Sequence, residues 1–199
     1  SPGNREIWHN RGRLRWNWGN WLAQRGIDPE ETYARAQEDL ERAASLDPGV
    51  AETWFYLGSA HSSAAIWRSQ HDADPRAAYA TAESALQKAI DLAPSWVIAL
   101  SGRATNRYCW AEFLRRRGDE WLPTSQTALA DFTRALDLDP KRVADRWGRG
   151  SVYLQMKRWA EAVADFTAAA ELDPASEPPH RADFEEALAG LRDAEAAGS

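Results

Sequence analysis

Two histidines and two aspartates lie close together in the sequence, at His61, His71, Asp72 and Asp74. Imidazole nitrogens and carboxylate oxygens bind zinc, but only where the ligands converge on one point. Here His71, Asp72 and Asp74 fall at an expected turn, whereas His61 lies ten residues before His71 on the preceding expected helix. The spacing therefore predicts no metal site.

The single cysteine, Cys109, is the one candidate for a strong nucleophile. A nucleophilic cysteine needs a neighbouring base and a group that orients the base. Its neighbours Arg107, Tyr108 and Trp110 supply neither, so we interpret Cys109 as a packed thiol. Gly148-Arg149-Gly150 lies inside an expected helix and does not form a phosphate-binding loop. We therefore expect no catalytic residue, no cofactor and no enzyme activity.

The prolines reveal an internal repeat. Pro2, Pro48, Pro94 and Pro140 are each separated by 46 residues, and Pro174 follows after a further 34. Ten residues after each of the first four come Gly12, Gly58, Ala104 and Gly150. A fixed period in this range indicates stacked helical units. Because such a unit cannot bury its apolar face alone, the whole chain is expected to form one continuous array.

Each interval between these prolines contains two expected amphipathic helices. In the second interval, Trp54, Leu57, Gly58 and His61 follow helical spacing. The second helix of each interval carries a small, a large and a small residue at steps of four and three, which predicts close packing against a neighbouring helix. These triplets are Ala36, Leu40 and Ala43; Ala82, Leu86 and Ala89; Ala128, Phe132 and Ala135; and Ala162, Phe166 and Ala169.

These residues resemble the tetratricopeptide repeat family, whose pattern is W-x2-L-G-x2-Y, then A-x3-F-x2-A, then P. Trp54, Leu57 and Gly58 match its first half, with His61 at the tyrosine position. The fourth unit matches through Gly150, Tyr153, Ala162, Phe166, Ala169 and Pro174, and the first through Trp8, Gly12, Ala36, Ala43 and Pro48. The resemblance implies an all-α solenoid of stacked antiparallel helix pairs that forms a right-handed superhelix.

Two departures from the family pattern stand out. The third unit is weakest at its start, where Leu100, Arg103, Ala104 and Arg107 occupy the family positions. Arginine also replaces leucine in the first and fourth units, at Arg11 and Arg149.

Residues 1–199 are thus expected to form one domain, with units at about 2–47, 48–93, 94–139 and 140–174 and a capping helix at about 180–196. The first three units exceed the 34-residue family length by twelve residues, which alignment from both ends places at 19–32, 65–78 and 111–124.

An aromatic residue recurs in the additional segments, at Trp21, Trp67 and Phe113. We interpret these three as core residues of lengthened helices. Both helices of each long unit are expected to grow by about one to two turns, or roughly 8–10 Å. Tight turns are expected near residues 26–28, 71–73 and 118–119.

In the resembling family, partners lie along the concave groove formed by the first helix of each unit. Carrying that face over unit by unit implies a binding surface made of His9, Arg13, Trp16, Asn17, Phe55, Ser59, Ser62, Ser101, Thr105, Tyr108, Trp147, Ser151 and Gln155. The set lacks the Lys/Asn/Arg group with which some family members hold a terminal carboxylate. A polar groove with isolated aromatic residues suits an extended or helical peptide.

The charges are unevenly distributed. Residues 1–27 carry a balance of +4 and residues 160–199 a balance of −8, within a net charge of −6. The net charge argues against nucleic acid as the main partner. The sequence contains no run of about 18 apolar residues, so it predicts no membrane span. One cysteine is compatible with a reducing compartment, so we expect a cytoplasmic location.

Three functions remain open at this point. The first is a protein-interaction scaffold that binds a protein or peptide in the concave groove. The second is self-association, because a basic first end and an acidic last end could stack head to tail. The third is a regulatory or targeting domain of a larger bacterial signalling enzyme.

Overall fold

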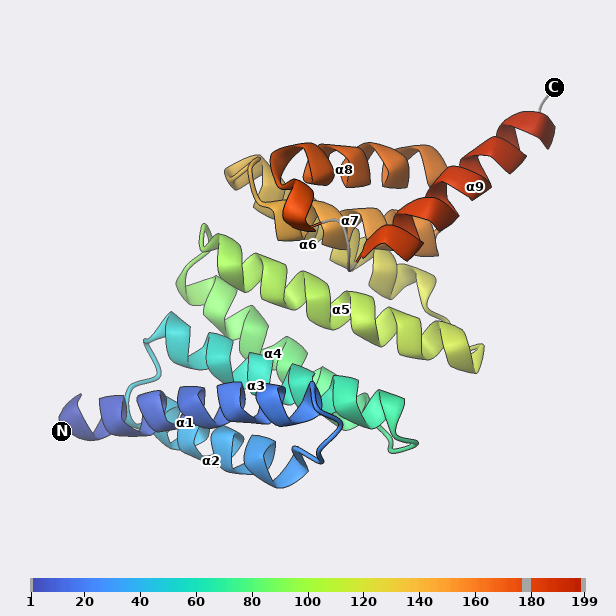
Figure 1. The fold of residues 1–199 in the computed structure, drawn as a ribbon. Helices are drawn as coiled ribbons and strands as arrows, with labels where there is room; N and C mark the ends of the chain where they lie inside the picture. Colours follow the sequence, from blue (N-terminus) through green and yellow to red (C-terminus); the bar gives the residue numbers. More distant parts are fainter. Residues whose placement is uncertain (1, 177–179, 198–199) are drawn as a thin grey trace.

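The computed structural model describes residues 2–176 and 180–197, and over these residues it contains α-helices, one short 3-10 helix and no strand (Figure 1). The expected all-α fold is therefore confirmed. The elements in chain order are α1 (Pro2–Ala23), α2 (Glu30–Leu46), α3 (Ala51–Gln70), α4 (Arg76–Leu92), α5 (Val97–Arg117), α6 (Leu122–Leu138), α7 (Val143–Gln155), α8 (Trp159–Leu172), η1 (Pro174–Ser176) and α9 (Arg181–Ala197).

The helices stack as antiparallel pairs (Figure 1). The pairs are α1 with α2, α3 with α4, α5 with α6, and α7 with α8. The second helix of each pair also packs against the helix that follows it, so α9 packs on α8 as the first helix of a further pair would. Successive first helices touch one another along α1, α3, α5, α7 and α9, whereas the second helices show no comparable contacts among the described residues. The first helices therefore form the inner, concave side of the array.

The core follows the repeated small, large, small triplets. Leu40, Leu86 and Phe166 have no exposed surface and Phe132 only 2%, and the alanines on either side of them are fully buried. Glycine on the facing first helix makes room for the large residue. A Cβ atom added at Gly150 would lie only 2.3 Å from the Phe166 ring. The glycine and the large residue together set how closely the two helices of this pair approach.

The twelve additional residues enter mainly the first helices. Helices α1, α3 and α5 have 22, 20 and 21 residues, whereas α7 has 13. The second helices α2, α4 and α6 have 17 residues against 14 in α8, which is less than one extra turn. The expectation that both helices grow by one to two turns was therefore wrong for the second helices. The turns lie where expected, with left-handed backbone at Gly26, Asp72 and Gly118.

The repeated aromatic of the added segments is not core in every pair. Phe113 is 8% exposed and Trp67 is half-buried, but Trp21 is 38% exposed. The prediction of a core position is wrong for Trp21, because no helix of the described chain packs on the outer side of α1.

The arginines that depart from the family pattern form ion pairs between the two helices of a pair. Arg103 binds both carboxylate oxygens of Asp131 at 2.7 and 2.6 Å, and Arg107 adds a third contact to Asp131 at 2.7 Å. In the first pair, Arg11 and Arg15 bind Asp39 in the same way. These aspartates are almost fully buried.

The fourth pair repeats the arrangement with Arg149, which binds Asp165 through two hydrogen bonds of 2.7 Å. The second pair replaces it with apolar residues, since Leu57 and Ala85 stand 46 residues after Arg11 and Asp39 and are buried. The chain thus contains both an ionic and an apolar version of one contact.

His61 takes the place of Arg15 and Arg107 in the second pair. Its Nε2 atom is buried without a hydrogen-bond partner among the described residues. Burial, with a smaller contribution from Arg68, lowers the pKa of His61 to about 4. The imidazole therefore stays neutral in the folded chain at pH values where an unfolded histidine is protonated, since the unfolded pKa is about 6.5.

We expect this burial to make the protein less stable in mild acid. As the pH falls from about 6.5 toward 4, the unfolded chain takes up a proton that the folded chain does not, so the free energy of unfolding decreases. The expected contribution to the free energy of unfolding is about 1–2 kcal/mol. This is less than the full pKa shift would give, because the ring is partly exposed and solvent screens its charge. Urea unfolding at pH 7.5 and pH 5 measures it. His61→Gln should reduce the pH dependence, and a pH dependence equal to that of the wild type would contradict this assignment.

Candidate functional site

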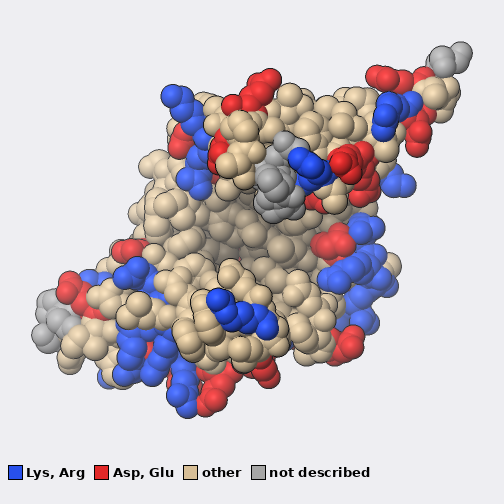
Figure 2. Space-filling view, viewed as in Figure 1, with Lys and Arg blue, Asp and Glu red and all other residues tan. Residues whose placement is uncertain are grey.

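The concave side of the array is the surface on which the first helices converge. Figure 2 shows this face hollowed over the middle of α5, with an uncharged floor and charged residues along the rim. The basic patch at the right edge lies where Figure 1 has the end of α5, whose last turn contains Arg115, Arg116 and Arg117. Two of the cavities in the described part of the chain lie on this side of the array.

The first cavity lies between the C-terminal halves of α1 and α3, and we call it the α1–α3 hollow. It has a volume of about 360 Å³. Its lining carries no charged residue and consists of Asn20, Ala23, Gln24, Tyr33, Ser63, Ile66, Trp67 and Gln70. Most of these residues belong to the turns by which α1 and α3 exceed the length of α7. The additional residues therefore lengthen the concave surface and create a cavity on it.

Hydrogen bonds fix the walls of the α1–α3 hollow. The Tyr33 hydroxyl donates to Asn20 Oδ1 at 2.9 Å, and the Trp16 indole N–H donates to Ser63 Oγ at 3.0 Å. Burial raises the pKa of Tyr33 to about 12, so its hydroxyl remains protonated and continues to donate at physiological pH. The side-chain amides of Gln24 and Gln70 are exposed at the cavity. Each amide can both donate and accept a hydrogen bond.

The second cavity lies between α5, α7 and α9, and we call it the α5–α9 hollow. It forms because α7 ends at Gln155, which corresponds in the 46-residue repeat to Cys109, whereas α5 continues to Arg117. The cavity has a volume of about 240 Å³. It is lined by Tyr108, Glu112, Arg115, Ser151, Leu154, Gln155, Lys157, Trp159, Asp183 and Glu186.

Two carboxylates of the α5–α9 hollow are held by neighbouring side chains. Burial of Glu112 opposes its ionisation, but hydrogen bonds from Arg115 at 2.9 Å and Gln155 at 3.0 Å outweigh burial and lower its pKa. Asp183 accepts a hydrogen bond from Ser151 at 3.3 Å. This end of the concave surface is therefore charged and mixed in sign, unlike the α1–α3 hollow.

The structure brings together three of the residues implied by the family resemblance. Tyr108, Ser151 and Gln155 line the α5–α9 hollow, although Ser151 is mostly buried. Asn17 and Thr105 are exposed, and Ser59 is half-buried. Ser62 is buried.

Three of the implied residues are instead structural. His9 is buried and hydrogen-bonded through Nδ1 to Thr53 at 3.0 Å, which joins α1 to α3. Ser101 is buried and donates to Asp145 at 2.8 Å, which joins α5 to α7. Trp147 is 2% exposed and packs on Phe166. These three side chains hold neighbouring helices together, so they are removed from the candidate binding surface.

The remaining implied residues are half-buried and serve packing as well as surface. Trp16 packs against Tyr56 and Phe55 against Trp96, and the Arg13 guanidinium lies 6.0 Å from the Tyr56 ring. Because Trp16 and Phe55 adjoin core clusters, replacing either with alanine would change packing as well as the surface.

Sequence reasoning missed most of the residues that line the α1–α3 hollow. The implied set ends at Asn17 on α1, but the same helical face continues through Asn20 and Gln24. The signal was available, since residues at steps of three and four share a helix face. Extending that step into the added turns would have found Asn20 and, on α3, Ile66 and Gln70.

Three further observations concern alternative roles. Within residues 2–176 and 180–197, no three His, Cys, Asp or Glu side chains are grouped so that they could hold a metal ion. In that same part of the chain, none of the helices combines the length and apolar character needed to span a bilayer. Burial raises the pKa of the Cys109 thiol to about 12, so this thiol is not activated.

A model of the tetratricopeptide repeat family matches residues 147–176, which include most of α7, all of α8 and η1. No curated protein sequence is significantly similar to this chain. Similar solved structures, however, cover nearly all of it.

MamA aligns with a TM-score of 0.60 and 14% identity over 96% of this chain and 90% of its own. Pseudomonas aeruginosa PilF aligns with a TM-score of 0.58 and 20% identity over 95% of this chain and 71% of its own. TTC0263, a thermophilic TPR protein of Thermus thermophilus, aligns with a TM-score of 0.50 and 19% identity over 89% of this chain and 98% of its own. Residues 147–176 are therefore a tetratricopeptide repeat, and the chain as a whole has the fold of a tetratricopeptide-repeat solenoid.

Proposed function

We propose that this chain is a protein-interaction scaffold that binds an extended or helical peptide of a partner protein along its concave surface. The observation that supports the proposal most directly is the α1–α3 hollow, a cavity of about 360 Å³ lined by uncharged polar and aromatic residues on the inner face of the array. Ligand sites of proteins are usually concave and combine apolar walls with a few polar groups. The same role would serve a regulatory or targeting domain of a larger bacterial signalling enzyme.

In this proposal, an apolar side chain of the peptide enters the α1–α3 hollow and packs against Ile66 and Trp67. The amides of Gln24 and Gln70 at the cavity then hydrogen-bond the peptide backbone, because each has both donors and an acceptor. The helices that form the walls are fixed by packing, so binding should change their positions little. The absence of charge from this cavity favours an uncharged segment over a highly charged one.

The proposal can be tested by filling the cavity. Peptides selected from a displayed library of random sequences would be measured by fluorescence polarisation against the wild-type chain and Ala23→Trp. Ala23 lines the hollow, so an indole there should occupy the space and weaken binding by about tenfold or more, which corresponds to 1.4 kcal/mol. Ala80→Trp, at an exposed alanine of α4, is the matched control and should bind as the wild type does. Selected peptides that bind Ala23→Trp and wild type equally would contradict the proposed site.

A further inference from the structure

Arg13 of α1 carries a positive charge on the concave side that no carboxylate of the described chain binds. Its guanidinium is half-buried and lies 6.0 Å from the Tyr56 ring, and among the described residues it forms no hydrogen bond or ion pair. Three other arginines of α1 are paired, namely Arg5 with Glu6, and Arg11 and Arg15 with Asp39. Their charges are therefore neutralised, whereas that of Arg13 is available.

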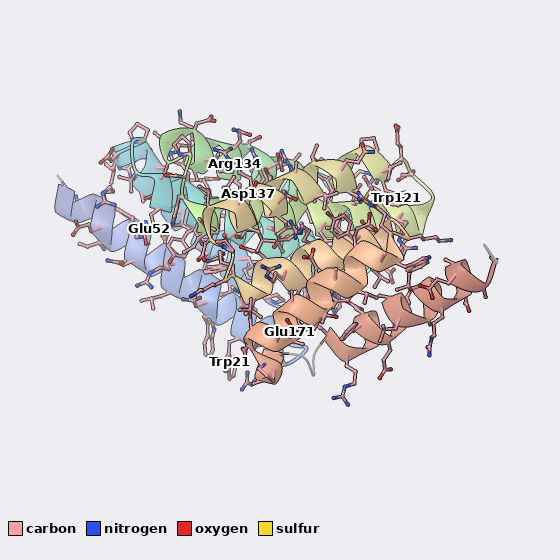
Figure 3. The ribbon with its side chains drawn as sticks, turned by 90° about the horizontal axis from the view of Figure 1, so that it is seen from above. Trp21, Glu52, Trp121, Arg134, Asp137 and Glu171 are labelled. Atoms are coloured by element: carbon pink, nitrogen blue, oxygen red, sulfur yellow. The ribbon has the colours of Figure 1, made fainter. Side chains whose placement is uncertain are left out.

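The acids on the neighbouring part of the array do not supply the missing partner. Glu6 binds Arg5. Glu52 of α3 lies beside the N-terminal half of α1 in Figure 3, and its carboxylate is 3.9 Å from His9 Nε2. The Glu52 side chain is 55% exposed, so water already solvates its charge. A carboxylate that a partner brings can therefore reach Arg13 without displacing an ion pair of the fold.

The repeat shows that the position of Arg13 belongs to the concave surface. The equivalent residues of α3, α5 and α7 are Ser59, Thr105 and Ser151, so only α1 of these four helices carries a charge there. Thr105 is exposed although α3 and α7 both contact α5, which means that the position stays open inside the array. Ser151 donates to the Asp183 carboxylate at 3.3 Å. A carboxylate can thus reach this position in the fold.

Arg13 also shares a helix face with residues of the α1–α3 hollow. Steps of four, three and four residues place Arg13, Asn17, Asn20 and Gln24 on one side of α1. Asn17 is exposed, and Asn20 and Gln24 line the hollow. Because Asn20 follows Arg13 by two turns, the two lie roughly 10 Å apart along the helix axis. An uncharged strip therefore leads from the hollow to a single positive charge.

The chemistry of this strip defines a peptide. A guanidinium binds a carboxylate best, because the two groups can form parallel hydrogen bonds. Partial burial removes some of the water that would otherwise weaken the attraction. An extended peptide advances about 3.3 Å per residue, so roughly 10 Å corresponds to about three residues. The long arginine side chain allows one residue more or less.

We propose that Arg13 selects peptides that carry an aspartate or glutamate two to four residues from the apolar side chain that fills the α1–α3 hollow. The inference rests on the proposed function and adds an acidic side chain to the peptide that binds there. Arg13 is then a residue that determines specificity, since it distinguishes acidic peptides from their neutral counterparts.

Paired peptides test this preference. Peptides selected on the wild-type chain from a displayed random library would be synthesised with amidated C-termini, each with a version in which the acidic residue is replaced by its amide. In fluorescence polarisation, the replacement should weaken binding to the wild type about tenfold. On Arg13→Gln both versions should bind alike, as weakly as the amide version binds the wild type. Arg13→Lys should keep a reduced preference, because lysine keeps the charge without the planar fork.

Arg42→Gln, at an exposed arginine of α2, is the matched control and should keep the full preference for the acidic peptide. Circular dichroism verifies that Arg13→Gln folds. A preference that survives in Arg13→Gln would overturn the inference. So would equal weakening of both versions, which would indicate that Arg13 only packs on Tyr56, and so would a dependence on Arg13 confined to peptides with a free C-terminus.

The Ala23→Trp variant separates failure of this inference from failure of the proposed function. If Ala23→Trp weakens binding but the selected peptides show no preference for the acid, the hollow remains the binding site and the role of Arg13 is wrong. If Ala23→Trp binds as the wild type does, the hollow is not the site and both proposals are wrong. A library that yields no binding peptide would also contradict both.

Discussion

Asp131→Ala should lower the free energy of unfolding by about 3–5 kcal/mol, the range observed when one partner of a buried ion pair is removed. The Asp131 and Arg103 side chains are 7% and 9% exposed, and their two hydrogen bonds are 2.7 and 2.6 Å long. Without the carboxylate, Arg103 keeps its charge in a place that water barely reaches. Urea unfolding followed by circular dichroism measures the loss.

The second pair supplies a matched control for this prediction. Leu57 and Ala85 hold the same two positions there and are 5% and 4% exposed. Arg103→Leu/Asp131→Ala should therefore recover most of the stability that Asp131→Ala loses, since apolar residues often replace a buried ion pair without cost. Arg107 keeps its hydrogen bonds to Glu83 in the double variant. A double variant as unstable as Asp131→Ala would show that the ionic contact has no apolar equivalent in this pair.

Phe166→Ala should also cost about 3–5 kcal/mol, because truncating a fully buried phenylalanine leaves a cavity as well as losing apolar contacts. The centroid of the Phe166 ring lies 5.2 Å from that of Trp147 in α7 and 5.8 Å from that of Phe184 in α9. Its loss therefore weakens the attachment of both helices to α8. Amide hydrogen exchange should accelerate in α9 more than in α2, and equal acceleration in both would contradict this local effect.

Gly150→Ala tests the same contact from the other side. Alanine gains up to about 1 kcal/mol of helix propensity over glycine. Its Cβ would nevertheless lie 2.3 Å from the Phe166 ring, and overpacking of this kind costs about 1–3 kcal/mol. In Gly150→Ala/Phe166→Ala the added methyl group occupies space that the ring has left. The double variant should therefore be more stable than Phe166→Ala, although Gly150→Ala alone destabilises the wild type.

The repeat of 46 residues was sufficient to predict the helix pairs, the turns and the buried triplets, because each of these depends on spacing alone. The ion pairs were not predicted, since the arginines were interpreted only as departures from the family pattern. A second signal was present in the sequence. Asp39 follows Arg11 by 28 residues, as Asp131 follows Arg103.

The candidate site was harder to predict than the fold. Family positions were carried over to His9 and Trp147, which the structure buries between helices. Whether a groove position is open depends on how closely the neighbouring first helices approach, and no single unit encodes that distance. The α5–α9 hollow was not predicted either. It results from the difference in length between α5 and α7, which belong to two different units.

The unequal lengths of the first helices have a consequence for how this chain can vary. The glycine and the large residue that join the helices of a pair lie ten and 38 residues after the boundary proline in the first two units, on the side of the added turns that is nearer the boundary. Residues inserted at the far tips thus broaden the array without altering its pitch. The width of the array and the number of repeats can therefore change independently. A new cavity can form at the far end of a helix pair while the contacts that join its two helices are kept.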